Sequence, residues 1–446
     1  MSNLSLVISE EVVAEVTALS RVFIGKDNKL GLRIGKKPVM VKRQQEDGSV
    51  KEEEVTVVAL FTFDGGEVVI RNIYAEKMDD YPEEDRTVTI LASSFFNNLS
   101  VFGRVAGGAS LEIDDQNKIV WFCSKDGGLR LKAAIQEQMI FSKAKPESYI
   151  DIMVNGEKLR RVCSAFSGFN VGFCYDNEEQ LIMYGGEGSQ CVKALLDIKK
   201  VAVSGNLSSS SKIDIMVPYK AAMKISGLFA GQNIKVVLTK EKLIIKDKFS
   251  WYESPLLLKQ KLKKESLDVL DKLSESAECA CMFKHDMLTM ALTAMRAATA
   301  TLKAESSQDV YLYMEYTDTV RFYLKDGSQV QFDPAQIVYK DGEKSFSVAF
   351  SQDVIERTIA KLGNMDFLAI AFSYTSDKNG AVATMHPGFV KDGNGAIDEF
   401  VTAYCSSMMY SVAYKDKAVE DKAVEDKAVE ASDAEASESD TGAEKE

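Results

Sequence analysis

The sequence predicts an α+β fold of three similar domains, in which pairs of helices pack on antiparallel sheet. The first observation is a repeat: the letters IDIMV stand at 150–154 and again at 213–217, each time before a helix-like segment. The second is that this strand-to-helix pattern occurs six times at steps of 63 to 83 residues, as expected of a repeated supersecondary unit. The third is that hairpin-like turns follow the helices. Together these features favour helices layered on antiparallel sheet.

Each of the six units begins with an apolar strand that leads into a helix. Apolar residues then recur at three- and four-residue spacing, so each helix is expected to bury one face. Ser9, Asn155 and Ser351 stand at helix starts, where their side chains can accept hydrogen bonds from free amides. Pro218 suits a first helical position. The predicted helices span 10–22, 93–105, 155–168, 218–230, 286–303 and 352–362.

Glycine-containing turns between apolar stretches predict β-hairpins behind the helices. They lack the lysine and hydroxyl residue of a phosphate-binding loop, so we do not interpret them as nucleotide sites. The first unit is longer than the others, and the polar stretch Lys42–Glu54 is expected to be the insertion responsible. The hairpin segments are FDGGEVVIRN from Phe63, SKDGGLRLKA from Ser124, GGEGSQCVKA from Gly185 and LKDGSQVQFD from Leu324.

Pairing the six units gives three domains, at 1–145, 149–257 and 277–414. Residues 258–276 are a linker that has the pattern of a short amphipathic helix. Residues 415–446 contain five lysines against twelve acids and repeat the letters KAVED. A five-residue period fits neither a helical face nor strand alternation, so this acidic tail is expected to be disordered.

Composition argues against several classes of protein. No apolar run approaches the roughly 20 residues of a membrane helix, and the N-terminus lacks the features of a signal peptide, so a cytoplasmic protein is expected. The seven cysteines form no CxxC pair, and the two histidines, His285 and His386, are far apart. No metal site, cofactor or set of catalytic residues is therefore expected, and the chain is not predicted to be an enzyme.

Positive charge is concentrated on the predicted helices of an otherwise acidic chain. The chain has a net charge of −13, yet its six helices hold 11 Lys and Arg against 7 Asp and Glu. Cations recur at matching positions after the helix starts, off the apolar faces. Such a surface suits sequence-independent contact with phosphates, although an ordinary solvated face would also carry such cations. The cations are Arg161, Lys224 and Arg357 at the sixth position, and Arg21, Arg104 and Arg296 at the twelfth.

At residues 1–414 the sequence resembles the three-domain DNA polymerase sliding clamps of bacterial type. The resemblance rests on the repeat pattern, on RAA at 296–298, on EGSQCV at 187–192 and on TAYCSSMMY at 402–410. It implies a ring-shaped homodimer whose helices line a hole for double-stranded DNA. Such a protein would act as a processivity factor, to which the DNA polymerase and the clamp loader bind. Whether the origin is bacterial or phage stays open. A different class, a repeat-built scaffold or interaction protein that does not encircle DNA, is the alternative.

The resemblance also implies a groove that receives short peptides from partner proteins. Met and Cys are adaptable enough for such a groove, although they also suit the core at the end of a strand. Two departures stand out: SSMMY at 406–410 replaces a Met-Pro-Met-like stretch, and TATLKAE at 299–305 replaces an aliphatic pair of the subunit interface. The implied groove residues are Gly188, Cys191, Cys405, Ser407, Met408 and Met409.

Overall fold

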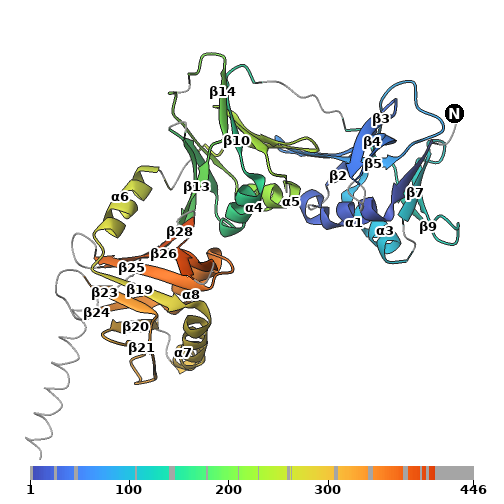
Figure 1. Ribbon diagram of the computed structural model, residues 1–446. Coiled ribbons are helices and arrows are strands. Elements are labelled where there is room, and N and C mark those ends of the chain that lie inside the picture. The colour runs from blue at the N-terminus through green and yellow to red at the C-terminus, as the bar shows by residue number, and fades with distance from the viewer. Residues whose placement is uncertain are drawn as a thin grey trace, which may run out of the picture. The chain divides into compact units, whose positions relative to one another are not determined.

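The structure is a computed structural model of the 446-residue chain (Figure 1). The chain divides into two compact units, Met1–Gly185 with Ala194–Leu262, and Gly186–Lys193 with Lys263–Glu446. The structure describes residues 4–24, 28–44, 49–105, 108–139, 146–176, 179–208, 210–229, 231–258, 262, 264–305, 310–339, 345–374, 380–391, 394–397 and 401–406.

The first unit contains most of the elements, in the chain order that follows. They are β1 (Leu4–Ser9), α1 (Glu10–Ala18), α2 (Ser20–Phe23), β2 (Lys29–Ile34), β3 (Val39–Gln44), β4 (Val50–Asp64), β5 (Glu67–Glu76), β6 (Arg86–Leu91), α3 (Ala92–Val105), β7 (Gly108–Asp114), β8 (Ile119–Cys123), β9 (Arg130–Ala134), β10 (Tyr149–Val154), α4 (Gly156–Ala165), β11 (Val171–Tyr175), β12 (Gln180–Glu187), β14 (Lys200–Ser204), β15 (Ile213–Val217), α5 (Lys220–Leu228), β16 (Ile234–Leu238), β17 (Lys242–Lys246) and β18 (Ser250–Pro255). Strand β13 (Gln190–Asp197) contributes residues to both units.

The second unit holds the remaining elements. They are α6 (Lys264–Glu275), β19 (Cys279–Lys284), α7 (His285–Glu305), β20 (Tyr311–Tyr316), β21 (Val320–Tyr323), β22 (Gln329–Phe332), β23 (Gln336–Tyr339), β24 (Phe346–Ser351), α8 (Gln352–Lys361), β25 (Phe367–Tyr374), β26 (Ala381–Lys391), β27 (Asn394–Ile397) and β28 (Val401–Ser406).

Antiparallel sheets form the framework of the first unit. A small sheet has the order β1-β7-β8-β9, and a large one runs β14-β10-β16-β17-β18-β5-β4-β2-β6, with β3 beside β4. In the large sheet β18 pairs with β5, from Ser250 opposite Arg71 to Glu253 opposite Val68. Residues predicted to belong to two domains, 1–145 and 149–257, thus share one continuous sheet.

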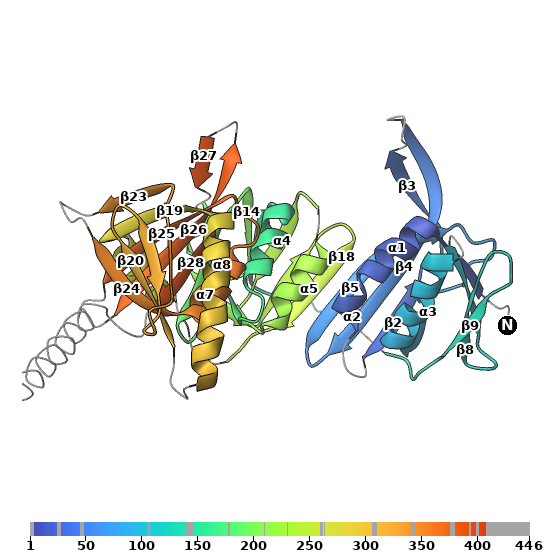
Figure 2. The ribbon, with the colours of Figure 1, turned by 90° about the horizontal axis from the view of Figure 1, so that it is seen from below.

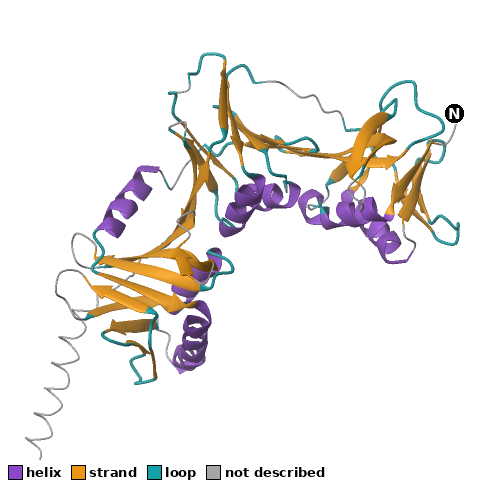
Figure 3. Ribbon diagram, in the orientation of Figure 1, coloured by secondary structure: helices purple, strands orange, loops and turns teal. Residues whose placement is uncertain are grey.

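In the second unit, the strands β28-β26-β25-β19-β23 form one sheet, and β22-β21-β20-β24 form another. Helices α7 and α8 pack on the strands from one side, and aromatic rings fill the space between the two sheets. Tyr316 lies at the centre of this core, with its ring 5.0 Å from that of Phe372 and 6.1 Å from that of Phe346. The predicted α+β architecture of helices on antiparallel sheet is confirmed (Figure 3).

The predicted helices are present, with differences at their ends. The first is divided by Leu19, whose amide bonds to Val16 and Thr17 in a tighter turn, so α1 and α2 replace one helix. Asn155 caps α4 by accepting from the Lys158 amide at 3.0 Å, whereas the hydroxyls of Ser9 and Ser351 make no cap hydrogen bond. Pro218 lies two residues before α5 rather than at its first position, because the helix begins at Lys220.

The predicted hairpins are confirmed, and each turn carries a glycine with positive φ: Gly65 and Gly66, Gly127, Gly188 and Gly327. The predicted insertion lies in β3 and β4, which pair from Val39 opposite Val55 to Gln44 opposite Val50. An extended hairpin therefore accounts for most of the extra length of the first repeat. The linker contains the predicted helix, α6. The three domain boundaries themselves stay a prediction.

Candidate nucleic-acid interface

The helices of the first unit lie side by side on one side of its sheets (Figure 2). Contacts run from α3 to α1, from α2 to α5 and from α5 to α4, which makes one continuous row. On the inner face of α1, Val13 and Val16 are completely buried. Close approach between α2 and α5 depends on Gly227, because a Cβ atom there would lie 2.5 Å from Cγ2 of Val22. Packing thus leaves the opposite face of the row for solvent or a ligand.

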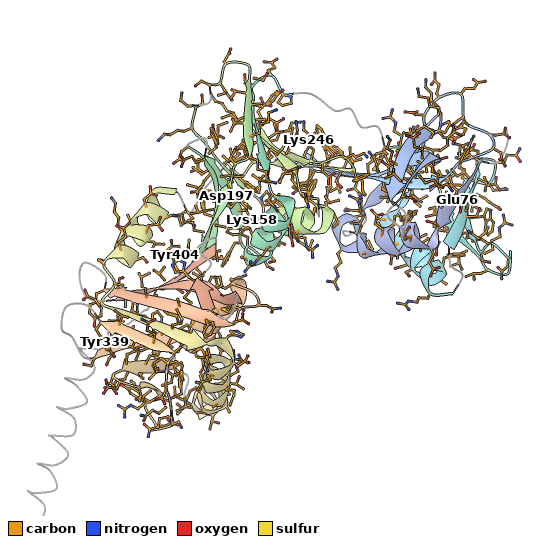
Figure 4. All side chains as sticks on the ribbon, in the orientation of Figure 1. Glu76, Lys158, Asp197, Lys246, Tyr339 and Tyr404 are labelled. Carbon is orange, nitrogen blue, oxygen red and sulfur yellow. The ribbon has the colours of Figure 1, made fainter. Side chains whose placement is uncertain are left out.

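Three of the predicted cations of this row are exposed: Arg21 on α2, Arg104 on α3 and Arg161 on α4. Arg21 and Arg104 have no ion-pair partner among the described residues. Lys158, also on α4, is different, because its Nζ lies 2.9 Å from Oδ2 of Asp197 (Figure 4). The helix row of the first unit therefore presents guanidinium groups, and those of Arg21 and Arg104 can reach an anion without first leaving a protein carboxylate.

Lys224 on α5 is placed differently from the other predicted cations. Its side chain is only 12% exposed and forms an ion pair with Glu67, at the start of β5. The hydroxyl of Tyr252 donates to the same carboxylate at 2.8 Å. Because Lys224 is held where the first two predicted domains meet, we interpret it as a structural cation, contrary to its predicted place on an exposed face.

In the second unit, Arg296 on α7 is exposed but bound by Glu356 on α8. Its Nε and Nη2 donate to Oε2 of Glu356 at 3.1 and 2.5 Å, and this carboxylate raises the pKa of Arg296. Gln352 is buried between the helices and donates to Oε1 of Glu356 at 2.8 Å and to the Leu292 carbonyl at 2.7 Å. Glu356 is thus both part of the helix seam and a local counter-charge to Arg296.

Arg357 on α8 is exposed, and its Nε donates to the Asp353 carbonyl of its own helix at 2.9 Å. Lys361 lies one turn further along. Burial, and then the charge of the neighbouring Arg357, lower the pKa of Lys361. Lys361 was not among the predicted site residues, although the four-residue spacing from Arg357 is a signal that could have identified it.

The residues implied for a peptide groove are only partly described. Gly188 is exposed in the turn before β13, with φ +60°, and Cys191 is 7% exposed in β13. Cys405 pairs with Ala383 in the ladder between β28 and β26. Ser407, Met408 and Met409 lie outside the described residues. The described residues among those implied for the groove therefore lie in a turn and in two strands of the second unit.

Metal sites and membrane helices are two other features that bear on function. Within the described ranges, no group of three or more His, Cys, Asp or Glu side chains is arranged to hold a metal ion. None of the helices in this part of the chain is long and apolar enough to span a membrane.

No protein-family model matches the sequence, and no curated protein matches it either. Solved structures do. The beta subunit of DNA polymerase from Streptococcus pyogenes matches with a TM-score of 0.63 and 10% identity, over 91% of this chain and 99% of that one. The DNA polymerase III subunit beta of Pseudomonas aeruginosa gives 0.62 and 13%, over 91% and 100%.

The Helicobacter pylori beta clamp bound to a DNA ligase peptide matches with a TM-score of 0.60 and 10% identity, over 91% of this chain and 99% of that one. At such identities the matches establish the arrangement of the backbone. This chain therefore has the fold of the bacterial DNA polymerase III beta clamps.

Proposed function

We propose that this protein is a DNA sliding clamp, a non-catalytic processivity factor that encircles duplex DNA as a homodimer and tethers a DNA polymerase to it. The observation that carries the proposal is the row of helices with exposed guanidinium groups, on a chain that has a clamp fold. A fold alone hosts many functions, so the placement of these cations is what supports this function.

The cations explain how such a protein holds DNA without stopping on it. Arg21, Arg104, Arg161 and Arg357 are exposed and lie off the buried faces of their helices. Contacts to phosphates carry no sequence information, and each can be exchanged for the next phosphate at little cost. We expect these four residues, together with Arg296, to contact the DNA backbone, whereas Lys224 is held by Glu67.

The negative charge of the rest of the chain also favours placement of the duplex against the helices. The chain as a whole carries a net charge of −13, and residues 415–446 account for −7 of it, while the helices other than α6 hold 11 Lys and Arg against 8 Asp and Glu. The remaining regions of residues 1–414 are therefore acidic and repel a polyanion. Repulsion from these regions and attraction to the helices together direct the duplex to the helix row.

Partner binding is the less direct part of the proposal. The Helicobacter pylori clamp of similar fold is bound to a DNA ligase peptide. By analogy we propose that peptides from a polymerase and a clamp loader bind at the groove residues Gly188, Cys191, Cys405, Ser407, Met408 and Met409. We place the protein with replicating DNA in the cytoplasm of a cell or of an infected host.

The test compares nicked circular DNA with the same DNA cut once. The protein is incubated with each DNA long enough for subunits to exchange, and gel filtration at high salt then separates bound from free protein. A closed clamp stays on circles and slides off free ends, because salt removes its phosphate contacts but not the topological link. Equal release from both DNAs would instead favour the repeat-built scaffold.

A further inference from the structure

Helix α6 lies on the side of the second unit opposite to α7 and α8 (Figure 1). It packs against β25 and β26, whereas α8 contacts β24 and β28. Leu267 is completely buried, and Val269 on the other face of the helix is 58% exposed. An amphipathic helix of the linker thus covers the sheet face that the other two helices leave open.

Asp271 fixes α6 to the two strands that bear the described groove residues. Its Oδ2 accepts from Nζ of Lys193 on β13 at 2.5 Å, and its Oδ1 accepts from the hydroxyl of Tyr404 on β28. Lys193 is only 16% exposed. The Ser373 hydroxyl on β25 donates to the carbonyl of Leu273 at 2.5 Å, which adds a third attachment. Figure 4 shows Tyr404 at this place in the fold.

Strand alternation places Cys191 under the same helix. Side chains two residues apart share one face of a strand, so Cys191 lies on the face of Lys193. Gln190, on the other face, donates to the Val354 carbonyl and to Oγ1 of Thr358 on α8, at 2.6 and 2.9 Å. Burial raises the pKa of the Cys191 thiol to about 12, and the carboxylate of Asp271 adds to that effect.

Strands β13 and β28 are neighbours in one sheet. We propose that the face of these two strands that carries Cys191, Lys193 and Tyr404 is a docking surface for acidic amphipathic peptides, and that α6 is its resident occupant. The proposal rests on the proposed function, since Cys191 is one of the residues assigned to partner binding. A partner peptide then gains access by displacing α6.

The contacts of α6 specify the chemistry of that peptide. Leu267 and Asp271 are one helical turn apart and face the sheet together. Displacement of α6 would leave the cation of Lys193 and the hydroxyl of Tyr404 without Asp271 in a poorly hydrated place, which is costly unless a new acceptor arrives. The incoming segment therefore carries a large apolar side chain and, about one turn away, a carboxylate.

The first test measures how readily α6 leaves the sheet, in the full-length protein. Asp271→Asn keeps the shape of the side chain but removes its charge, and Glu275→Gln is the matched control on the exposed face of the same helix. N-ethylmaleimide labelling of Cys191 is followed site by site by peptide mass spectrometry. We expect Asp271→Asn to raise the rate about tenfold, because it removes charged hydrogen bonds. Glu275→Gln should leave the rate unchanged.

Cys163, buried in α4 of the first unit, is the internal control. Its labelling rate should stay the same in all three proteins, which separates release of α6 from general unfolding. If Cys191 in Asp271→Asn reacts as slowly as in the parent protein, α6 is a fixed part of the sheet and the proposal is wrong.

The second test supplies the occupant from outside. In a full-length variant, residues 264–275 are replaced by a glycine-serine stretch of equal length, and a fluorescent peptide of sequence KESLDVLDKLSE is added. Saturable binding that disappears when the peptide's second Asp is changed to Asn supports the docking surface, and absence of binding overturns it. DNA retention on circles is measured on the same variant, so a failed docking surface and a failed clamp function give different results.

Discussion

Lys224 on α5 and Glu67 at the start of β5 form an ion pair where the first two predicted domains meet. Both side chains are largely buried, at 12% and 20% exposed. Tyr252 donates to the same carboxylate, and Arg71, four residues along β5 from Glu67, donates to the Ser250 hydroxyl at 2.7 Å. Charged groups thus reinforce the point where β5 and β18 continue one sheet.

The first prediction concerns this pair. Lys224→Met leaves Glu67 with the Tyr252 hydroxyl as its one hydrogen-bond partner among the described residues, so we expect the free energy of unfolding to fall by about 2 kcal/mol, as for a partly buried charge without its partner. Lys220→Ala, at an exposed site on the same helix, should change it by less than about 0.5 kcal/mol. Urea denaturation measures both.

A double variant makes this prediction sharper. If the cost comes from an unpaired carboxylate, Glu67→Gln combined with Lys224→Met should cost less than the sum of the two single changes. Additive costs would show that the two charges do not interact in solution.

Local signals predicted much of the fold. The repeated IDIMV segments form β10 and β15, and both lead into helices of the predicted type. Glycine turns such as Gly127 and Gly327 mark hairpins because their φ is positive, a conformation that other residues rarely adopt. These features depend on a few neighbouring residues, which is why the sequence alone reveals them.

Features that depend on distant residues were not predicted. Lys224 has the spacing of an exposed cation, and only the approach of β5, more than 150 residues earlier, makes it an internal partner of Glu67. The short helix α6 was expected, but not its attachment through Asp271 to Lys193 and Tyr404.

The second prediction concerns DNA. One variant replaces four exposed cations by Ala: Arg21, Arg104, Arg161 and Arg357. It should bind DNA of every sequence more weakly, and to the same degree. The slope of log K against log salt concentration should become shallower by roughly 0.9 for each phosphate interaction that is removed. Changing Lys36, Lys37, Lys240 and Lys248 to Ala removes the same charge from exposed loop sites. Binding isotherms over a range of salt distinguish the two variants. Equal effects would mean that only net charge matters.

The third prediction concerns assembly. Each chain supplies six strand-to-helix units. The resemblance to the bacterial sliding clamps implies a ring of twelve such units, so two chains are expected to close it. Light scattering should give a mass close to twice the 49.2 kDa of one chain. A mass that stays at one chain over a wide range of concentration would contradict the closed homodimer, and the polar TATLKAE segment at 299–305 would be the first place to seek the reason.

The fourth prediction, which rests on the sequence alone, concerns the acidic tail. Its repeated KAVED letters and its excess of seven acids give it little apolar surface to bury. A chain that ends at Tyr414 should therefore unfold at the same temperature as the full chain. Calorimetry checks this, and a Tm lower by several degrees would indicate that the tail packs on the core.

The fifth prediction follows from the counter-charge beside Arg296. Glu356 holds this guanidinium through two hydrogen bonds, so part of its attraction for phosphate is already neutralised. Glu356→Gln can still bond to Gln352 but carries no charge. We expect the variant to bind duplex DNA more tightly. The plot of log K against log salt concentration should become steeper by somewhat less than the roughly 0.9 that one phosphate contact contributes.

The control for this change is Glu137→Gln, which removes an equal charge at an exposed site outside the helices. Its effect on DNA binding should be smaller, because screening at physiological salt limits a distant charge to a range of about 8 Å. If both variants tighten binding to the same degree, Arg296 does not contact DNA. If Glu356→Gln alone tightens it, Arg296 lies on the DNA-binding face, and Glu356 limits how firmly the protein holds the duplex, which favours sliding over arrest.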